Sequence, residues 1–186
     1  MCEKAGAQLV LDPRGVEAEP AVAPGSGQRI EGTLRGKRVG IIDNLLAGMR
    51  DLGDALAVEL EEVHQVCAVR RWTVPQSTVP PLGTIAAITD EVDVAVIGLG
   101  NCGGCTTWTC AFSAQLREAV PTLDVVTKPF ESLARRAFWA HGLPEQPLVV
   151  LRAHAEEASE AEFRDFARLV ASACASELTT AGGGPR

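Results

Sequence analysis

The sequence lacks the long apolar runs and the excess of basic residues that accompany membrane and nucleic-acid proteins. No apolar run in its 186 residues approaches the ~18 residues that a membrane-spanning helix needs. Asp and Glu outnumber Lys and Arg by 24 to 17, a net charge of −7, whereas nucleic acids and anionic lipids attract basic surfaces. The basic pairs Arg70–Arg71 and Arg135–Arg136 are too short to form a binding stripe. We therefore expect no nucleic-acid and no membrane partner.

The first residues, Met-Cys-Glu-Lys-Ala-Gly, also lack the basic stretch followed by an apolar one that marks a secretory signal. We therefore expect a cytoplasmic location, where thiols stay reduced and the six cysteines do not imply a disulfide framework. Cys67 and Cys174 lie in apolar patterns, which indicates core packing. Cys2 falls in what we expect to be a loose terminus.

Composition divides the chain into an arm, one domain and a tail. Residues 1–36 are rich in Pro and Gly and have no periodicity, which predicts an irregular N-terminal arm. Residues 37–178 alternate apolar runs with helical patterns, which predicts a single α/β domain. Residues 179–186 are expected to form a disordered tail.

Five apolar runs in the domain are typical of buried strands, and helical patterns separate them. We predict strands at residues 38–43, 63–71, 92–99, 123–127 and 148–152. We predict helices at 45–60, 84–91, 106–119 and 130–140, and a last one that begins with the capping box Ser159-x-x-Glu162. This alternation predicts an α/β three-layer sandwich around a mostly parallel five-stranded sheet, with the flavodoxin-like strand order 2-1-3-4-5.

The most informative segment is residues 94–110, VAVIGLGNCGGCTTWTC. A buried strand ends there in glycines, and a helix follows a Cys-x-x-Cys made of Cys102 and Cys105. The first N–H groups of a helix have no helical partner, and the positive end of the helix dipole favours anions. A thiol at such a position ionises readily and becomes a nucleophile near neutral pH. The segment therefore predicts thiol chemistry.

Ligands of such sheets bind beyond the carboxyl ends of the strands, where strands 1 and 3 meet. We expect Cys102 to be the nucleophile, Cys105 the resolving thiol, and Lys128 and His154 the sources of positive charge or protons. The glycines of this segment let a ligand approach a nest of N–H groups that holds a carboxylate or an oxyanion. The candidates for substrate binding are Asp43, Asn44, Gly100, Asn101, Gly103, Gly104, Thr106 and Thr127.

Other interpretations of these residues stay open. A Cys-x-x-Cys can be half of a metal site, with Cys110 or His154 adding ligands. However, there is no second Cys-x-x-Cys, and the spacing to Cys110 matches no common zinc or iron–sulfur pattern, so we expect no metal or other cofactor. The two cysteines can also be small packing residues. Asp43 can be a helix N-cap, and we expect Cys110 and Trp108 to serve packing.

Residues 98–106 resemble the UGSC family, named for a selenocysteine-Gly-Ser-Cys motif whose first position is cysteine in many members. Here the motif reads Cys102-Gly103-Gly104-Cys105, between Gly98-Leu99-Gly100-Asn101 and Thr106-Thr107-Trp108-Thr109. Other segments that resemble the family are LDPRG at 11–15, IDN at 42–44, TKPF at 127–130 and the stretch from Pro147 to the last helix.

The resemblance implies that Cys102 occupies the position that selenocysteine can fill, and so is the attacking atom of a redox-active pair. Two residues depart from the family pattern. Gly104 replaces the serine, which removes a hydroxyl donor, and Asn101 stands where we expect aspartate, which removes a proton acceptor or a negative charge. The family's likeness to components of selenium-dependent reductases of amino acids implies a reaction type and names no substrate.

We expect an enzyme, a thiol-based oxidoreductase that acts on a small-molecule or protein thiol or disulfide. Its expected partners are that substrate, a thiol reductant and a further copy of itself. One alternative is a redox-neutral thiol enzyme, racemase-like or lyase-like, acting on a small carboxylate while fully reduced. The other is a non-enzymatic accessory subunit or metal carrier. Only the first requires a reversible Cys102–Cys105 bridge.

Overall fold

The computed structural model describes residues 28–76, 80–152 and 155–180. These residues form a five-stranded parallel sheet in the order β2-β1-β3-β4-β5. The strands are β1 (Arg38–Asp43), β2 (Ala68–Thr73), β3 (Val94–Gly100), β4 (Thr122–Thr127) and β5 (Leu148–Leu151). The predicted fold class and strand order are confirmed.

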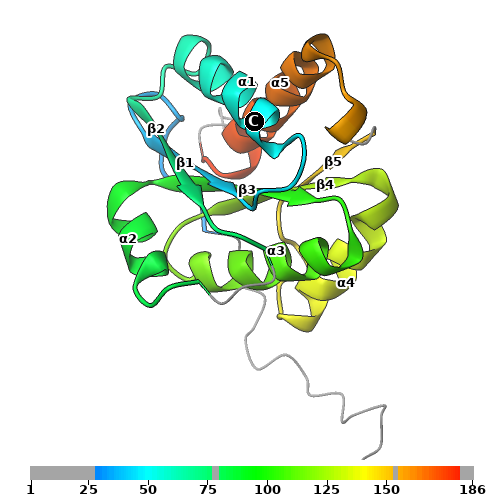
Figure 1. The fold of residues 1–186 in the computed structure, drawn as a ribbon. Helices are drawn as coiled ribbons and strands as arrows, with labels where there is room; N and C mark the ends of the chain where they lie inside the picture. The colour runs from blue at the N-terminus through cyan, green and yellow to red at the C-terminus, as the bar shows by residue number, and fades with distance from the viewer. Residues whose placement is uncertain (1–27, 77–79, 153–154, 181–186) are drawn as a thin grey trace, which may run out of the picture.

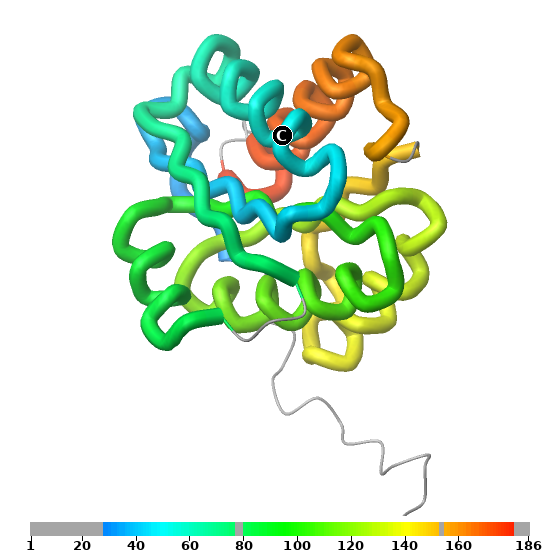
Figure 2. The backbone as a smooth tube through the Cα atoms, in the orientation of Figure 1, coloured from blue at the N-terminus to red at the C-terminus, as the bar shows by residue number. Residues whose placement is uncertain are grey.

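Helices cover both faces of the sheet, which makes three layers (Figure 1). Two helices, α1 (Met49–Glu62) and α5 (Glu160–Glu177), pack together on one face. The other face carries α2 (Thr84–Glu91), α3 (Gly103–Leu116) and α4 (Glu131–Ala140). The short 3₁₀ helices η1 (Lys128–Phe130) and η2 (Ala155–Glu157) follow β4 and β5. The backbone trace shows the same three layers (Figure 2). No helix in the described part of the chain is long and apolar enough to span a membrane.

The central strand β3 is buried along its whole length. Neighbouring strands on both edges and helices on both faces exclude water from it, which explains its continuous apolar sequence. The peptide bond between Gly98 and Leu99 is cis. The strand ends at Gly100, two residues before Cys102, so the fully buried central strand leads directly to the cysteine motif.

The strand predicted at 63–71 begins only at Ala68, because residues 63–67 form the turn that follows α1. The N–H of Val66 donates to the carbonyl of Leu60, and Gln65 turns the chain with a φ of 54°. The apolar alternation there belongs to a helix end. Cys67 lies in this turn and is exposed, so the prediction of core packing was wrong for it.

Cys174 and Cys110 are both buried, as predicted. Desolvation in the core raises the pKa of the Cys174 thiol to about 12 and that of Cys110 beyond the usual range. Neither thiol ionises near neutral pH. Among the described cysteines, Cys67 and Cys102 differ from these inert core residues in exposure. Cys102 and Cys105 differ from them because their sulfurs accept backbone N–H groups.

The first helix begins at Met49, later than its apolar pattern suggests. Leu45, predicted on the buried face, lies in the preceding loop with a φ of 62° and is exposed. The N-cap of α1 is Gly48, so the interpretation of Asp43 as a helix N-cap was wrong. The Oδ1 atom of Asp43 instead accepts the N–H of Leu45 at 2.7 Å within the loop.

The last part of the predicted arm packs against the domain. Leu34 is buried in the core cluster between the sheet and the α1–α5 layer. Ile30 forms a β-bridge with Thr179, and its N–H donates to the carbonyl of Leu178 at 2.9 Å. The sequence could not place these contacts, because they join residues about as far apart as the chain allows.

A buried carboxyl group interrupts the apolar core beneath α3. The Oδ2 atom of Asp124 on β4 accepts the hydroxyl of Ser113 at 2.7 Å and the amide of Gln146 at 2.9 Å. Its Oδ1 atom has no hydrogen-bond partner among the described residues. The guanidinium of Arg117 donates to Oε1 of the Gln146 side chain. Burial raises the pKa of Asp124 to about 7, although these hydrogen bonds and the Arg117 charge act in the opposite direction.

Replacing this carboxyl group, Asp124→Asn, should flatten the pH dependence of stability. Because the pKa in the folded state, about 7, exceeds the unfolded value of 3.8, the stabilisation is complete below about pH 4 and is lost as pH rises to 7. The full difference is at most about 4 kcal/mol. Urea unfolding at pH 5 and pH 8 measures the part that is lost above pH 5, about two of the roughly three pKa units, or about 3 kcal/mol.

The control is Asp93→Asn. The Arg38 guanidinium lowers the pKa of Asp93 below its ordinary 3.8, so the contribution of Asp93 to stability is complete above about pH 4 and the control should leave the slope between pH 5 and pH 8 unchanged. If the free energy of unfolding of Asp124→Asn changed between pH 5 and pH 8 as much as that of the wild type, the raised pKa of Asp124 would be contradicted.

Candidate functional site

The two cysteines of the motif cap helix α3 with their sulfur atoms. Cys102 is the N-cap residue, and its Sγ accepts the N–H of Cys105 at 3.0 Å. The Sγ of Cys105 accepts the N–H of Cys102 at 2.7 Å. This is a capping box in which two thiols occupy the positions usually held by a hydroxyl and a carboxylate. The arrangement explains why the helix begins at Gly103, three residues before the predicted start.

Cys105 has the more enclosed of the two sulfurs. Its Sγ accepts a second N–H, from Asn101 at 3.2 Å, and its thiol donates to the carbonyl of Cys102 at 3.1 Å. The residue is fully buried. Burial, and next the hydrogen bond with the Cys102 side chain, raise the pKa of Cys105 to about 11, while the N–H of Asn101 acts to lower it. Cys105 therefore keeps its proton at neutral pH.

Cys102 is partly exposed, and both residues are free thiols. The motif thus places one reachable sulfur and one sealed sulfur at the same helix N-terminus. The outer sulfur, that of Cys102, lies at the N-terminus of α3 and accepts the N–H of Cys105. An attacking thiol needs this combination of access and stabilisation.

Gly100 and Thr106 hold the start of α3 against the sheet. The Oγ1 atom of the buried Thr106 donates to the carbonyl of Cys102 at 2.6 Å. A Cβ on Gly100 would lie 2.7 Å from Val126 Cγ1 and 3.0 Å from Thr106 Oγ1. Both residues were predicted to bind substrate. The structure gives each of them a contact that positions Cys102.

Gly103 and Gly104 lie on the open side of the motif. Both are exposed, and a Cβ on either would meet nothing within 4 Å. As the first two residues of α3 they have no N–H acceptor within the helix. They are the predicted binding residues that lie closest to open space beside Cys102.

Asn101 is held by two other strand ends. Its Oδ1 accepts the hydroxyl of Thr127 at 2.9 Å, and its Nδ2 donates to Oε1 of Glu156 at 3.3 Å. Thr127 ends β4, and Glu156 lies on η2 after β5. Glu156 was not predicted as a site residue, although it follows the fifth strand as His154 does.

Asp43 and Asn44 shape the loop after β1. Asn44 is fully buried, and its Nδ2 donates to the carbonyl of Leu99 at 3.0 Å. This bond ties the β1–α1 loop to the end of β3. Asp43 is the half-buried last residue of β1, and its side chain holds the turn at Leu45. Both predicted binding residues therefore flank the motif, and Asn44 supports its backbone.

Of the two predicted proton donors, Lys128 and His154, the structure describes only Lys128. Lys128 is exposed on η1, and its Nζ forms an ion pair with Glu131 at 2.5 Å, within its own helical turn. His154 lies outside the described residues.

Trp108 stacks on Phe112 at a ring-centroid distance of 5.4 Å and packs against the core cluster beneath α2 and α3, as predicted. Among the described residues, no group of three or more His, Cys, Asp or Glu side chains is placed to hold a metal ion.

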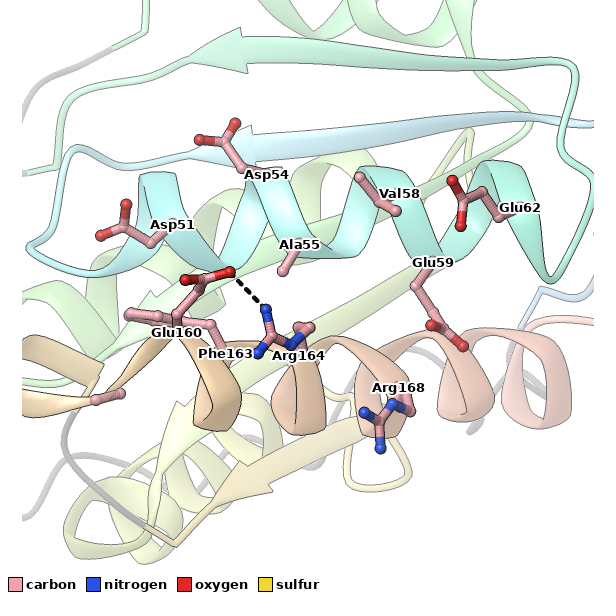
Figure 3. Close-up of a pocket in the computed structure, with 11 residues that line it drawn as sticks. Asp51, Asp54, Ala55, Val58, Glu59, Glu62, Glu160, Phe163, Arg164 and Arg168 are labelled. Carbon is pink, nitrogen blue, oxygen red and sulfur yellow. Dashed lines mark hydrogen bonds and ion pairs between the residues drawn. The ribbon is translucent and has the colours of Figure 1, made fainter.

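A cavity of about 780 Å³ lies elsewhere, between α1 and α5 (Figure 3). Its α1 wall is acidic, with Asp51, Asp54, Glu59 and Glu62, and Arg164 and Arg168 face it from α5. Arg164 forms an ion pair with Glu160 across the first turns of α5. The lining residues include no cysteine or histidine, so the volume of this cavity does not locate the thiol chemistry.

A comparison with models of protein families finds a match for this chain. The sequence model of the UGSC family matches residues 9–180. The match includes the cysteine motif, all five strands and most of the segment before β1. No curated protein matches the chain.

Adding a methyl group at the end of β3, Gly100→Ala, should destabilise the protein. The new Cβ overlaps a valine of β4 and crowds the hydroxyl of Thr106, so the backbone must shift, at a cost of roughly 1–3 kcal/mol. Urea unfolding measures the loss. Gly103→Ala is the matched control, since its Cβ enters open space and should change stability by about 0.5 kcal/mol or less. Equal effects of the two substitutions would refute the close approach at Gly100.

Proposed function

We propose that this chain, which belongs to the UGSC family, is a thiol-dependent oxidoreductase that uses the Cys102–Cys105 pair to reduce a disulfide. The observation that carries the proposal is the difference between the two sulfurs, one reachable and one sealed, at the N-terminus of α3. A reducing, cytoplasmic compartment suits a pair that must be returned to the dithiol state. The substrate class is a small-molecule or protein disulfide.

In the first step the Cys102 thiolate attacks one sulfur of the substrate disulfide. A bond forms between Cys102 and that sulfur, and the other half of the substrate leaves as a thiolate that takes a proton from water. The N–H of Cys105 and the dipole of α3 stabilise the attacking charge. The open N–H groups of Gly103 and Gly104 beside it suit an anionic group of the substrate.

In the second step Cys105 resolves the mixed disulfide. Two of the causes that raise the pKa of Cys105 are the hydrogen bond to Cys102 and the charge on it, and both vanish once Cys102 is covalently bonded. The N–H groups of Asn101 and Cys102 then support the Cys105 thiolate. The proton of Cys105 goes to water and its sulfur attacks Cys102 Sγ. The bond between Cys102 and the substrate breaks, and the remaining half of the substrate leaves as a thiolate that takes up a proton.

The steps balance as a two-electron transfer. The cysteine pair loses two electrons and becomes a disulfide, and the substrate becomes two thiols. A thiol reductant must then reduce the Cys102–Cys105 bond. Lys128 and His154 remain the candidates for delivering protons to the departing thiolates, although Lys128 must leave Glu131 to do so.

The proposal predicts different fates for two serine variants exposed to a small aromatic disulfide. Cys105→Ser should accumulate a stable mixed disulfide on Cys102, because the resolving thiol is gone. Cys102→Ser should lose both the mixed disulfide and the internal bond. In wild-type protein the Cys102–Cys105 bond should form and should disappear on addition of dithiothreitol. Peptide mapping by mass spectrometry measures each species.

All samples carry Cys2→Ser, so that thiol does not contribute. Cys67→Ser is the matched control, because Cys67 is an exposed thiol outside the motif and its loss should leave the internal bond unchanged. A wild-type chain that forms no Cys102–Cys105 bond would contradict the proposal. If such a chain is active while fully reduced, the redox-neutral alternative holds. A stoichiometric metal in the purified protein supports the carrier alternative.

A further inference from the structure

Asn101 connects the sulfur of Cys105 to two distant parts of the chain. Its backbone N–H is one of two that donate to Cys105 Sγ, at 3.2 Å, beside that of Cys102 at 2.7 Å. The direction of both N–H bonds depends on the backbone orientation of residues 100–102. Any group that fixes Asn101 therefore also fixes the donors to the sealed sulfur.

The side chain of Asn101 is fixed from both sides. Thr127 donates to its carbonyl oxygen from the end of β4, and Glu156 accepts from its amide nitrogen on η2. These bonds pair the amide oxygen with a donor and the amide nitrogen with an acceptor. An aspartate at 101 could not make them both, because its carboxylate would face the carboxylate of Glu156.

The segment that carries Glu156 is itself held in place. Gly48, at the start of α1, packs so closely against η2 that a Cβ there would lie 2.6 Å from the carbonyl oxygen of Ala155. Ala155 is buried in the core cluster between the sheet and α1. Glu156 thus reaches Asn101 from an anchored turn, although its own side chain is exposed.

We infer that Thr127 and Glu156 are positioning residues that set the reduction potential of the Cys102–Cys105 pair by holding Asn101. The inference rests on the proposed function. The N–H bonds to Cys105 stabilise the sulfur in the dithiol and thiolate forms more than in the disulfide, which carries less negative charge. Loosening Asn101 weakens these bonds and shifts the equilibrium toward the disulfide.

The test is a redox titration of the pair against glutathione, read by mass spectrometry after acid quenching. Thr127→Val keeps the side-chain shape and loses the hydroxyl. It should shift the equilibrium toward the disulfide by about threefold to tenfold, which is roughly 15–30 mV. Asn101→Asp should produce a shift in the same direction, because it faces Glu156 with a like charge.

Two further variants separate positioning from a general loss of structure. Asn101→Asp with Glu156→Gln restores a donor opposite an acceptor and should bring the equilibrium back toward the wild-type value. Glu157→Gln makes the same change of charge on the neighbouring residue of η2 and should leave the equilibrium unchanged. Far-ultraviolet circular dichroism confirms that each variant is folded.

The possible outcomes are distinct. A wild-type chain that forms no disulfide overturns the proposed function and this inference together. A normal disulfide whose equilibrium changes by less than about twofold in both Thr127→Val and Asn101→Asp overturns the inference alone. Failure of Glu156→Gln to rescue Asn101→Asp also overturns it, because the pairing of donor and acceptor would then have no effect.

Discussion

The site depends on the pair of sulfur–amide hydrogen bonds that begin α3. Each cysteine side chain accepts the N–H of the other residue, so the helix start is satisfied by two thiols. A helix N-terminus without such acceptors would leave its N–H groups to water. Because the acceptors are sulfurs, the interaction that starts the helix also places two thiol groups at one helix end. Folding and the proposed chemistry therefore depend on the same contacts.

The surrounding structure makes the two sulfurs unequal. Close packing at Gly100 and the hydroxyl of Thr106 hold the first turn of α3 against β4, and Asn44 supports the end of β3 from the next loop. Cys105 is thereby enclosed, and its pKa is raised to about 11, while Cys102 stays partly open. The inequality provides the order of events that the proposed two-step reduction requires.

The sequence predicted the fold well because the central strand β3 is apolar throughout and several helices carry periodic apolar patterns. The motif was predictable because glycines and two cysteines meet at a strand end. Glu156 was not, because an exposed glutamate looks like any other and gains its role from a bond to a residue 55 positions away. Cys67 was misplaced because apolar residues at a helix end imitate a strand. Long-range pairing and chain ends are the features that local patterns do not encode.

The most direct measurement of the central claim is the rate at which each cysteine of the reduced, native protein reacts with iodoacetamide, resolved by peptide mass spectrometry. The account predicts that Cys102 reacts faster than the exposed Cys67, while Cys105 reacts no faster than the buried Cys174. Modification of Cys105 at the rate of Cys102, or of Cys102 more slowly than Cys67, would contradict the account.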